Sequence, residues 1–373
     1  MTADPIVERV DARVLRVPLP QPMRPFGYEA ITVCFVSVVA DGVEGTGFAY
    51  TLDAGIGITA AMVEEVVGPA FAGRRLSRWA ATGAEVLALT RRLSSTAYTA
   101  AVSAVDIAVW DLRARLADSP LWRLLGGVPD PVPFYGSGRG GHLMPVARLA
   151  DLNAAYLEEG FAAVKVGVGA VPPAEDVARV AALRSAVGEA ATIMVDGSER
   201  LGIADALDLG RRLDPFGLAW FEEPLPAEDV DGYRLLAERL TTPLATGEHF
   251  QQLATQAHYL RATDVAYYQP DAALGGGVTG ALRMAALVTA QSRRIAWHSL
   301  ADLHIHLAAA TPGSDWVEDF PILDAVIEDP LRPVAGTALP PDRAGHGIRW
   351  DRAALDHYTV SGRSPARDER KTA

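Results

Sequence analysis

The stretch AVKVGVG, residues 163–169, is a short apolar run with one lysine, Lys165, near its middle. A run of this length with several valines is typical of a buried strand. Side chains alternate along a strand, so Lys165 and residue 167 point to the same face. Residue 167 is a glycine. The stretch therefore predicts a barrel strand that carries one ammonium group beside a position with no side chain.

Similar apolar runs recur along the chain, separated by segments with helical spacing. They are VPFYG (132–136), ATIMVDG (191–197), GLAWFEE (217–223), TPLATGE (242–248), DVAYYQPD (264–271) and RRIAWHS (293–299). A repeat of about 25 to 30 residues is the size of one βα unit. Successive units of this kind predict a parallel (β/α) barrel, which we place over residues 128–345.

The chain before residue 128 has a different pattern. Residues 7–19 and 31–42 are rich in β-branched residues and predict strands, and the long helical pattern at 96–117 stops near Ser119-Pro120. We therefore expect a separate α+β domain over residues 1–127. The charged, aperiodic end at 366–373 is expected to be disordered.

The net charge, the lengths of the apolar stretches and the cysteine count exclude several classes of protein. The 373 residues carry a net charge of -12 without a basic stripe, which argues against nucleic-acid binding. No apolar stretch reaches the roughly 18 residues of a membrane span, and no signal-peptide pattern opens the chain. The single cysteine, Cys34, cannot form a disulfide within the chain. We expect a cytoplasmic protein in which Cys34 is a buried strand residue.

Ionisable residues stand at the ends of the barrel runs, where (β/α) barrels hold their active sites. They are Lys165, Asp196, Glu222, Glu248, Asp271 and His298. Three converging carboxylates, Asp196, Glu222 and Glu248, would repel one another unless a cation lay between them. All-oxygen ligands suit Mg²⁺ or Mn²⁺. These three residues therefore predict a divalent metal site.

Asp271 and His298 lie on neighbouring predicted strands. A carboxylate beside an imidazole fixes its tautomer and raises its basicity, so the pair predicts a general base. The alternative is a buried histidine with a structural partner. His304 and His306 lie within a helical run, and we expect them to be structural or surface residues.

Motifs along nearly the whole chain resemble the enolase superfamily, in its mandelate racemase subgroup. They are the helix AVSAVDIAVWDLRARLADSPLWRLLGG (101–127), VKVGVG, IMVDGSE, WFEEPL, ATGEH, QPDAALGGGVTGAL, WHS and WVED. The resemblance implies a (β/α)7β barrel under a capping α+β domain, to which residues 346–365 return. It also implies Mg²⁺ on Asp196, Glu222 and Glu248, with Glu223 outside the ligand set.

The resemblance further implies roles at the substrate. The His298–Asp271 dyad would be the base on one face, and Lys165 would help to polarise the substrate's carboxylate. Glu318 would lie near the substrate's carboxylate or enolate oxygen. The loop from Pro18 to Ala30 would be a lid over the site. Within this loop, the candidate substrate contacts are Arg24, Phe26 and Tyr28.

Two residues depart from the family pattern. Gly167 stands where a second lysine is usual, and Ser198 stands where an asparagine is common. A racemase needs a proton carrier on each face of the substrate, whereas a dehydratase can work with one. If elimination is anti, a further acid is needed, and the candidates are His249, Arg139 and His142. Ser198, Arg139 and His249 are also expected to contact the substrate.

The sequence thus predicts a lyase that removes the proton next to a carboxylate, most simply a Mg²⁺-dependent dehydratase of an acid sugar. A racemase or epimerase of a 2-hydroxy acid is the first alternative. A metal-binding relative that has lost catalysis and binds a small carboxylate is the second. Family habit is the ground for expecting a homo-oligomer.

Overall fold

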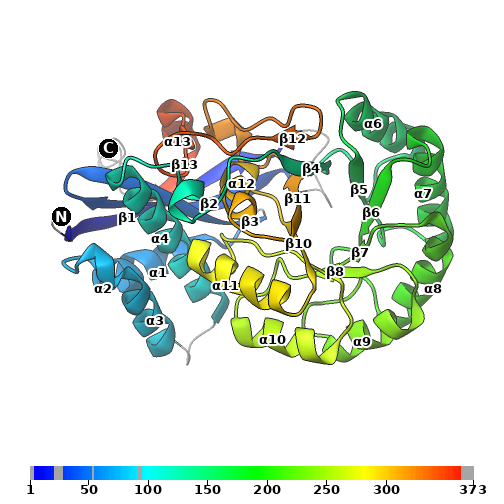
Figure 1. The fold of residues 1–373 in the computed structure, drawn as a ribbon, viewed down its shortest axis with the longest axis horizontal. Helices are drawn as coiled ribbons and strands as arrows, with labels where there is room; N and C mark the ends of the chain where they lie inside the picture. The colour runs from blue at the N-terminus through cyan, green and yellow to red at the C-terminus, as the bar shows by residue number, and fades with distance from the viewer. Residues whose placement is uncertain (1–3, 21–27, 53, 91–94, 363–373) are drawn as a thin grey trace, which may run out of the picture.

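A computed structural model describes residues 4–20, 28–52, 54–90 and 95–362. Two units are visible in it: an antiparallel sheet with its helices, and a ring of strands enclosed by helices (Figure 1). The described part of the chain therefore has the predicted fold class, a barrel with an N-terminal capping domain. The domain boundaries at residues 127 and 345 stay a prediction.

The capping domain is built on a four-stranded sheet with the order β13-β1-β2-β3. Its strands are β1 (Val7–Pro18), β2 (Ala30–Ala40), β3 (Val43–Leu52) and β13 (Thr359–Gly362). Its helices are α1 (Gly57–Met62), α2 (Gly68–Phe71), α3 (Trp79–Thr90) and α4 (Ser95–Leu116). Every residue of β2 except Ser37 is buried, including Cys34 as predicted. Such a continuous apolar strand indicates that both faces of the sheet are covered.

Helix α4 lies directly on β3 because two glycines of the strand leave room for its backbone. A Cβ at Gly45 or Gly47 would overlap the backbone of α4 at Ala108 or Ala104. The close approach fixes β3, and with it Tyr50 near the end of the strand. This strand end is one of the parts of the capping domain that reach the barrel mouth.

The barrel contains eight parallel strands within the described residues, closed by pairing of β11 with β4. They are β4 (Val132–Gly136), β5 (Ala163–Gly167), β6 (Thr192–Asp196), β7 (Phe221–Glu222), β8 (Leu244–Thr246), β9 (Tyr267–Tyr268), β10 (Arg294–Trp297) and β11 (Ser314–Asp319). Seven helices connect them, namely α6 (Val146–Glu158), α7 (Pro173–Val187), α8 (Ile203–Leu213), α9 (Val230–Arg239), α10 (Leu253–Ala262), α11 (Gly277–Ala290) and α12 (Ala301–Ala309). The (β/α)7β prediction is confirmed.

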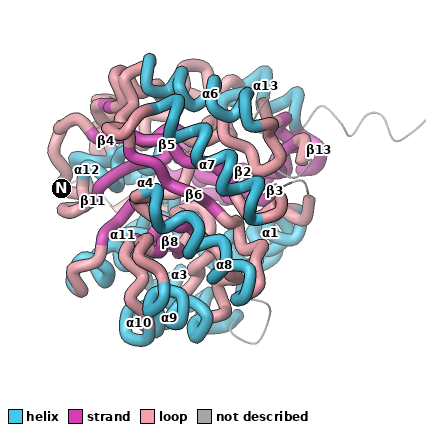
Figure 2. Tube along the Cα trace, turned by 90° about the vertical axis from the view of Figure 1, so that its right-hand side faces the viewer, coloured by secondary structure: helices cyan, strands magenta, loops and turns pink. Residues whose placement is uncertain are grey.

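The helices lie outside and the strands inside, as the view turned by 90° shows (Figure 2). Inside the ring, Trp220 is fully buried and packs against Tyr135, Tyr267 and Trp316 at ring-centroid distances of 5.4, 4.8 and 5.8 Å. This aromatic layer fills the barrel, so the barrel is a packed core with no pore through it. It also forms a rigid floor beneath the residues at the strand ends.

Short elements link the barrel back to the capping domain. They are α5 (Leu121–Leu124), β12 (Thr337–Ala338) and α13 (Arg352–Tyr358). After α13 the chain forms β13, which pairs antiparallel with β1. Residues 366–373, for which we expect disorder, lie outside the described residues. Among the helices described, none combines the length and apolarity that crossing a membrane would require.

His306 is a structural residue of helix α12. It is fully buried, its Nδ1 atom accepts a hydrogen bond from the backbone N–H of Trp122 at 3.1 Å, and its Nε2–H donates to the carbonyl of His346 at 2.9 Å. A protonated ring would turn both nitrogens into donors and lose the bond from Trp122. Burial is the main reason why the pKa of His306 is lowered to about 3.

This lowered pKa predicts a loss of stability in acid. Between pH 6.5 and about 3 the unfolded chain holds a proton on His306 that the folded chain does not. Folding stability should therefore fall by about 1.4 kcal/mol per pH unit over this window, and be fully retained above pH 6.5. Urea unfolding of the wild type and of His306→Gln at pH 7.5 and 5.0 measures this change in the free energy of unfolding. The variant should show the shallower pH dependence; equal slopes would contradict the assignment.

Candidate active site

The ionisable residues predicted from strand ends lie around the mouth of the barrel. Their positions follow from the strands: Lys165 lies within β5, Asp196 ends β6, Glu222 ends β7, His298 directly follows β10, and Glu318 lies within β11. A cavity of about 490 Å³ opens here, between the barrel and the capping domain. Its lining includes Lys165, Asp196, Glu248, His298 and Glu318 from the barrel, and Tyr28 and Tyr50 from the capping domain.

Lys165 is buried and forms the centre of a charged cluster. Its Nζ atom lies 2.5 Å from Glu222 Oε1, 2.9 Å from Glu318 Oε1 and 3.8 Å from Asp196 Oδ2. Burial alone lowers the pKa of Lys165, but the attraction of Glu222 and Glu318 outweighs burial and raises the pKa well above its usual value. The side chain is therefore a fixed positive charge, suited to stabilising an oxyanion rather than to taking a proton.

Glu222 is fully buried and held on all sides. Besides Lys165, it accepts hydrogen bonds from Trp220 Nε1 at 2.9 Å and Gln269 Nε2 at 2.6 Å. Burial raises the pKa of Glu222 to about 8, against the opposing effect of Lys165. Nearby Asp196, Glu318 and Glu248 raise it further through repulsion. Trp220 and Gln269 thus hold one carboxylate oxygen, Oε2, and Lys165 holds the other.

The cluster has more negative than positive groups. Asp196, Glu222 and Glu318 share the ammonium group of Lys165, whereas Glu248 lies 3.2 Å from His298 Nε2. Like charges gathered at buried or partly buried positions are costly. A divalent cation among Asp196, Glu222 and Glu248 would remove the excess charge and would meet only oxygen ligands, which suits Mg²⁺. The donor set of the predicted metal site therefore fits this metal.

A second group of ligand atoms lies nearby. Three residues, Glu199, Glu223 and His249, each offer one ligand atom, and these three atoms lie within 4.8 Å of one another. This group is already satisfied internally, because His249 Nδ1 lies 3.1 Å from Glu223 Oε2 and the N–H of Ala227 donates to Glu199 Oε1 at 2.7 Å. Burial lowers the pKa of His249, but the bond to Glu223 and the acidic surroundings raise it to about 11. The three residues are therefore a second candidate metal site, in which His249 already pairs with Glu223.

His298 and Asp271 form the predicted pair. His298 Nδ1 lies 2.9 Å from Asp271 Oδ2, and Asp271 Oδ1 accepts from the N–H of Ala273 at 2.7 Å. The other ring nitrogen, Nε2, lies 3.2 Å from Glu248 Oε2. The carboxylate of Asp271 therefore fixes the tautomer and directs Nε2 toward the carboxylate cluster and the cavity.

The same surroundings determine the charge of His298. Burial lowers its pKa, but the negative charges of Glu248, Glu318 and Asp271 together raise it to about 10. A cation bound at Glu248 would oppose that attraction and make the neutral, proton-accepting ring more accessible. The dyad and the carboxylate cluster are therefore electrostatically coupled.

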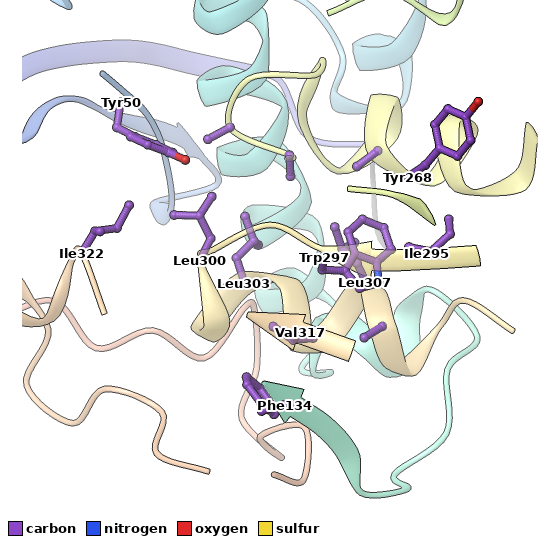
Figure 3. Packing of buried hydrophobic residues seen from close by; sticks show 14 of the residues in the cluster. Tyr50, Phe134, Tyr268, Ile295, Trp297, Leu300, Leu303, Leu307, Val317 and Ile322 are labelled. Carbon is purple, nitrogen blue, oxygen red and sulfur yellow. The ribbon is translucent and has the colours of Figure 1, made fainter. Parts of the chain in front are cut away.

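Tyr50 is a site residue that the sequence did not reveal. It comes from β3 of the capping domain, and its hydroxyl donates to Asp271 Oδ2 at 2.7 Å. The same hydroxyl lies 3.4 Å from His298 Nδ1. Figure 3 shows Tyr50 beside a packed group that continues through Leu300 and Leu303 of the barrel. No local motif marks this tyrosine, because its partner lies 221 residues away in the chain.

His304 supports the dyad from below, consistent with the structural role expected for it. Its Nδ1–H donates to the carbonyl of Ser299 at 3.0 Å, and its Nε2 accepts from the N–H of Ala272 at 3.0 Å. These are the residues that follow His298 and Asp271 in the chain. One fully buried side chain therefore ties together the two loops that carry the dyad.

The predicted substrate contacts have different outcomes. Tyr28, Ser198 and His249 all line the cavity. Arg139 is not among its lining residues, because its guanidinium is bound by Glu159 at 2.6 and 2.9 Å and lies over the ring of Tyr156. Arg24 and Phe26, together with much of the predicted lid, lie outside the described residues.

His142, one of the candidate acids, also lines the cavity. Its Nε2 lies 3.1 Å from both the carbonyl oxygen of Asp196 and the hydroxyl of Ser198. A carbonyl only accepts, so Nε2 carries the proton in the neutral ring. Burial is the main reason why the pKa of His142 is lowered to about 4.

Comparisons with known proteins agree with this architecture. The family model "Enolase C-terminal domain-like" matches residues 148–354, and the model of the mandelate racemase / muconate lactonizing enzyme N-terminal domain matches residues 9–126. The 3,6-anhydro-alpha-L-galactonate cycloisomerase of Streptomyces coelicolor is 32% identical over 366 residues, covering 95% of this chain and 100% of the relative.

Two dehydratases are also similar. The L-talarate/galactarate dehydratase of Salmonella typhimurium is 34% identical over 248 residues, which are 66% of this chain and 62% of the relative. The crystal structure of L-talarate dehydratase from Polaromonas, complexed with Mg and L-glucarate, superposes with a TM-score of 0.87 at 31% identity, covering 96% of this chain and 98% of that one. The first family model alone matches more than half of the chain, and the second matches the domain before it. The chain is therefore a member of the enolase superfamily, in the mandelate racemase and muconate lactonizing enzyme subgroup.

Proposed function

We propose that this enzyme is a Mg²⁺-dependent lyase that removes the α-proton of an acid sugar and expels the oxygen on the neighbouring β-carbon. For an open 2,3-dihydroxy acid this is a dehydration, and the enol product tautomerises to a 2-keto-3-deoxy acid. The observation that carries the proposal is the dyad of His298 and Asp271 facing a carboxylate cluster across one cavity. The relatives that act on acid sugars support the substrate class.

Asp196, Glu222 and Glu248 are proposed to hold the metal. When bound there, Mg²⁺ would supply electrostatic stabilisation to the substrate carboxylate as it becomes an enediolate. Lys165 is proposed to donate to the carboxylate oxygens, and Glu318, 2.9 Å from its Nζ atom, is proposed to lie beside them and hold the ammonium group in place. The Glu199, Glu223 and His249 group is proposed to be a structural ion cluster instead.

The two residues of the dyad have different roles in proton transfer. His298 Nε2 takes the α-proton, and Asp271 stabilises the imidazolium that forms. As the α-C–H bond breaks, a C=C bond forms and the β-C–O bond breaks. If the β-oxygen leaves on the same face, His298 returns the proton to it and water departs. One proton carrier is then sufficient, which favours elimination over racemisation at a site with Gly167.

A cycloisomerase is the second candidate, because a relative of that type matches along 95% of this chain. In a 3,6-anhydro acid the β-oxygen is part of an ether ring. The same elimination would therefore open the ring without releasing water. The mass of the product separates the two reactions, since dehydration lowers it by one water and ring opening leaves it unchanged.

The test is a screen of mono- and dicarboxylic acid sugars, with and without a 3,6-anhydro bridge, in the presence of Mg²⁺. Formation of a 2-keto acid is followed by its semicarbazone absorbance, and mass spectrometry identifies the product. Conversion of at least one acid to its 2-keto-3-deoxy product is expected. Epimerisation without elimination would mean that the enzyme is a racemase or epimerase. Binding of an acid sugar without turnover would mean that the protein has lost catalysis. Sedimentation velocity of the same sample tests the homo-oligomer that belongs to this proposal.

The capping domain should contribute to the proton-transfer step through Tyr50. We expect Tyr50→Phe to lower kcat about tenfold with little change in KM, because a hydrogen bond to the Asp271 carboxylate is lost while the cavity keeps its shape. Steady-state kinetics on the substrate found in the screen measure both constants, and a thermal melt checks the fold. A raised KM at unchanged kcat would instead mean that the hydroxyl binds substrate.

A further inference from the structure

Gly167 is not beside empty space. A Cβ built on this residue would lie 2.5 Å from Cε1 of the His142 ring, and closer still to Cγ and Nδ1. These distances are far below van der Waals contact, so no side chain fits at position 167 while the ring is there. The imidazole of His142 therefore lies where the side chain of residue 167 would begin.

The loop that carries His142 is held firmly against β5. The N–H of Gly167 donates to the carbonyl of Gly140 at 2.8 Å. A Cβ on Gly140 would lie 2.8 Å from Val166 Cγ1 and 2.9 Å from the carbonyl oxygen of Lys165, so the loop backbone packs on the strand without a gap. The loop sequence GRGGH is thus matched to the strand sequence KVG.

A buried arginine of helix α7 fixes the same loop from behind. Arg179 is 2% exposed and donates to the carbonyls of His142 and, at 2.8 Å, of Gly141. Asp176 accepts from Arg179 at 3.1 Å and from the N–H of Gly169, just beyond β5, at 2.7 Å. With Nε2 of the ring bonded at Asp196 and Ser198, His142 is held at both ends.

His142 and His298 belong to different sides of the cavity. Around the closed barrel the order runs β5, β4, β11, β10, so the strand under His142 and the strand that ends at His298 are separated by two others. Both residues line the same cavity. The ring of His142 therefore forms the wall on the β5 side, away from the dyad.

We propose that His142 is a specificity-determining residue, whose ring takes the volume that a lysine at position 167 would need and thereby confines proton transfer to the His298 side. The inference rests on the proposed function for its chemical consequence. Its steric part stands independently, because it concerns only residues 142 and 167. The substrate meets a flat, short imidazole wall on this side, where a long ammonium side chain would otherwise reach the α-carbon.

The steric part is tested by a double-mutant cycle on thermal stability, without any substrate. Gly167→Ala alone should lower the melting temperature by roughly 3 °C or more, because the new methyl group overlaps the His142 ring. In the His142→Ala background the same change should have less than half that effect. Gly202→Ala is the matched control, since nothing lies within 4 Å of a Cβ at Gly202 and its φ is ordinary. Equal effects in both backgrounds would overturn the pairing.

The chemical part is tested with the His142→Ala/Gly167→Lys double variant. In D₂O with Mg²⁺ and an acid sugar that lacks the β-leaving group, the wild type should exchange the α-hydrogen of one configuration only. The double variant should exchange both and produce the opposite configuration, detected by chiral chromatography. Exchange that stays one-sided in the double variant, with a normal melt and bound Mg²⁺, would overturn the specificity role.

Failure of the proposed function would look different. In that case neither the wild type nor any variant would exchange or convert an acid sugar, while the stability cycle would still show coupling between residues 142 and 167. That result would reject the acid-sugar lyase and support the steric pairing. His258→Ala, an exposed histidine on α10, controls for the loss of an imidazole elsewhere on the molecule.

Discussion

Replacement of His298 by asparagine is expected to abolish exchange of the substrate α-hydrogen with solvent, lowering its rate by roughly 1000-fold or more. Asparagine keeps a polar group near Asp271 but has no nitrogen that can take a proton. The measurement is loss of the α-hydrogen NMR signal in D₂O, which reports on proton abstraction even where elimination is slow. His258→Asn on the outer helix α10 should exchange at the wild-type rate.

Asp271→Asn should have a smaller but large effect, roughly 100-fold, because His298 remains but loses the carboxylate that orients it at 2.9 Å. The order of the two effects is the informative result. Wild-type exchange in His298→Asn would mean that another group is the base. Lys165 would then be the first to test, although its two carboxylate partners hold it in the charged form.

Removal of the metal should abolish activity, and loss of a strand-end carboxylate should weaken binding of the metal. After dialysis against chelator the enzyme should be inactive, and activity should return with added Mg²⁺. Asp196→Asn should weaken Mg²⁺ binding by at least about 100-fold in calorimetry with Mg²⁺ alone. The reason is that a neutral amide cannot replace the lost negative charge.

Glu199→Gln is the matched control, because it removes one carboxylate from the neighbouring group of Glu199, Glu223 and His249. It should leave Mg²⁺ affinity within a few-fold of the wild type. If instead Glu199→Gln destroyed binding and Asp196→Asn did not, the metal would belong to the neighbouring group. Full activity in excess chelator would contradict a metal requirement altogether.

Much of this architecture could be predicted because the relevant signals are local in sequence. Each barrel strand is one short apolar run, and the residue at its end is placed at the mouth by the strand itself. The parallel barrel followed from that rule, and its (β/α)7β form was implied by the resemblance to the enolase superfamily. The metal site at Asp196, Glu222 and Glu248 stays a prediction. The pairing of His298 with Asp271 needed only that their strands be neighbours, as they are.

The residues that sequence reasoning missed owe their positions to contacts between distant segments. Tyr50 reaches Asp271 because α4 holds β3 over the barrel, and no spacing within the capping domain reveals this. Arg139 was expected at the substrate but points to Glu159, because a nearby helix offers it a carboxylate. Gly167 predicts an empty space beside Lys165, but the ring of His142 fills it, and this ring comes from a loop that Arg179 holds in place.

The pairing of β13 with β1 has a consequence for how the protein is made. On the ribosome the N-terminal strand emerges early, but the strand that covers its edge emerges only after the whole barrel has been translated. Throughout that interval β1 has an open edge to which a strand of another nascent chain could add. Its sequence, VERVDARVLRVP, places charged residues along the strand, which discourages such pairing. The sheet of the capping domain is therefore begun before the barrel is synthesised and completed after it.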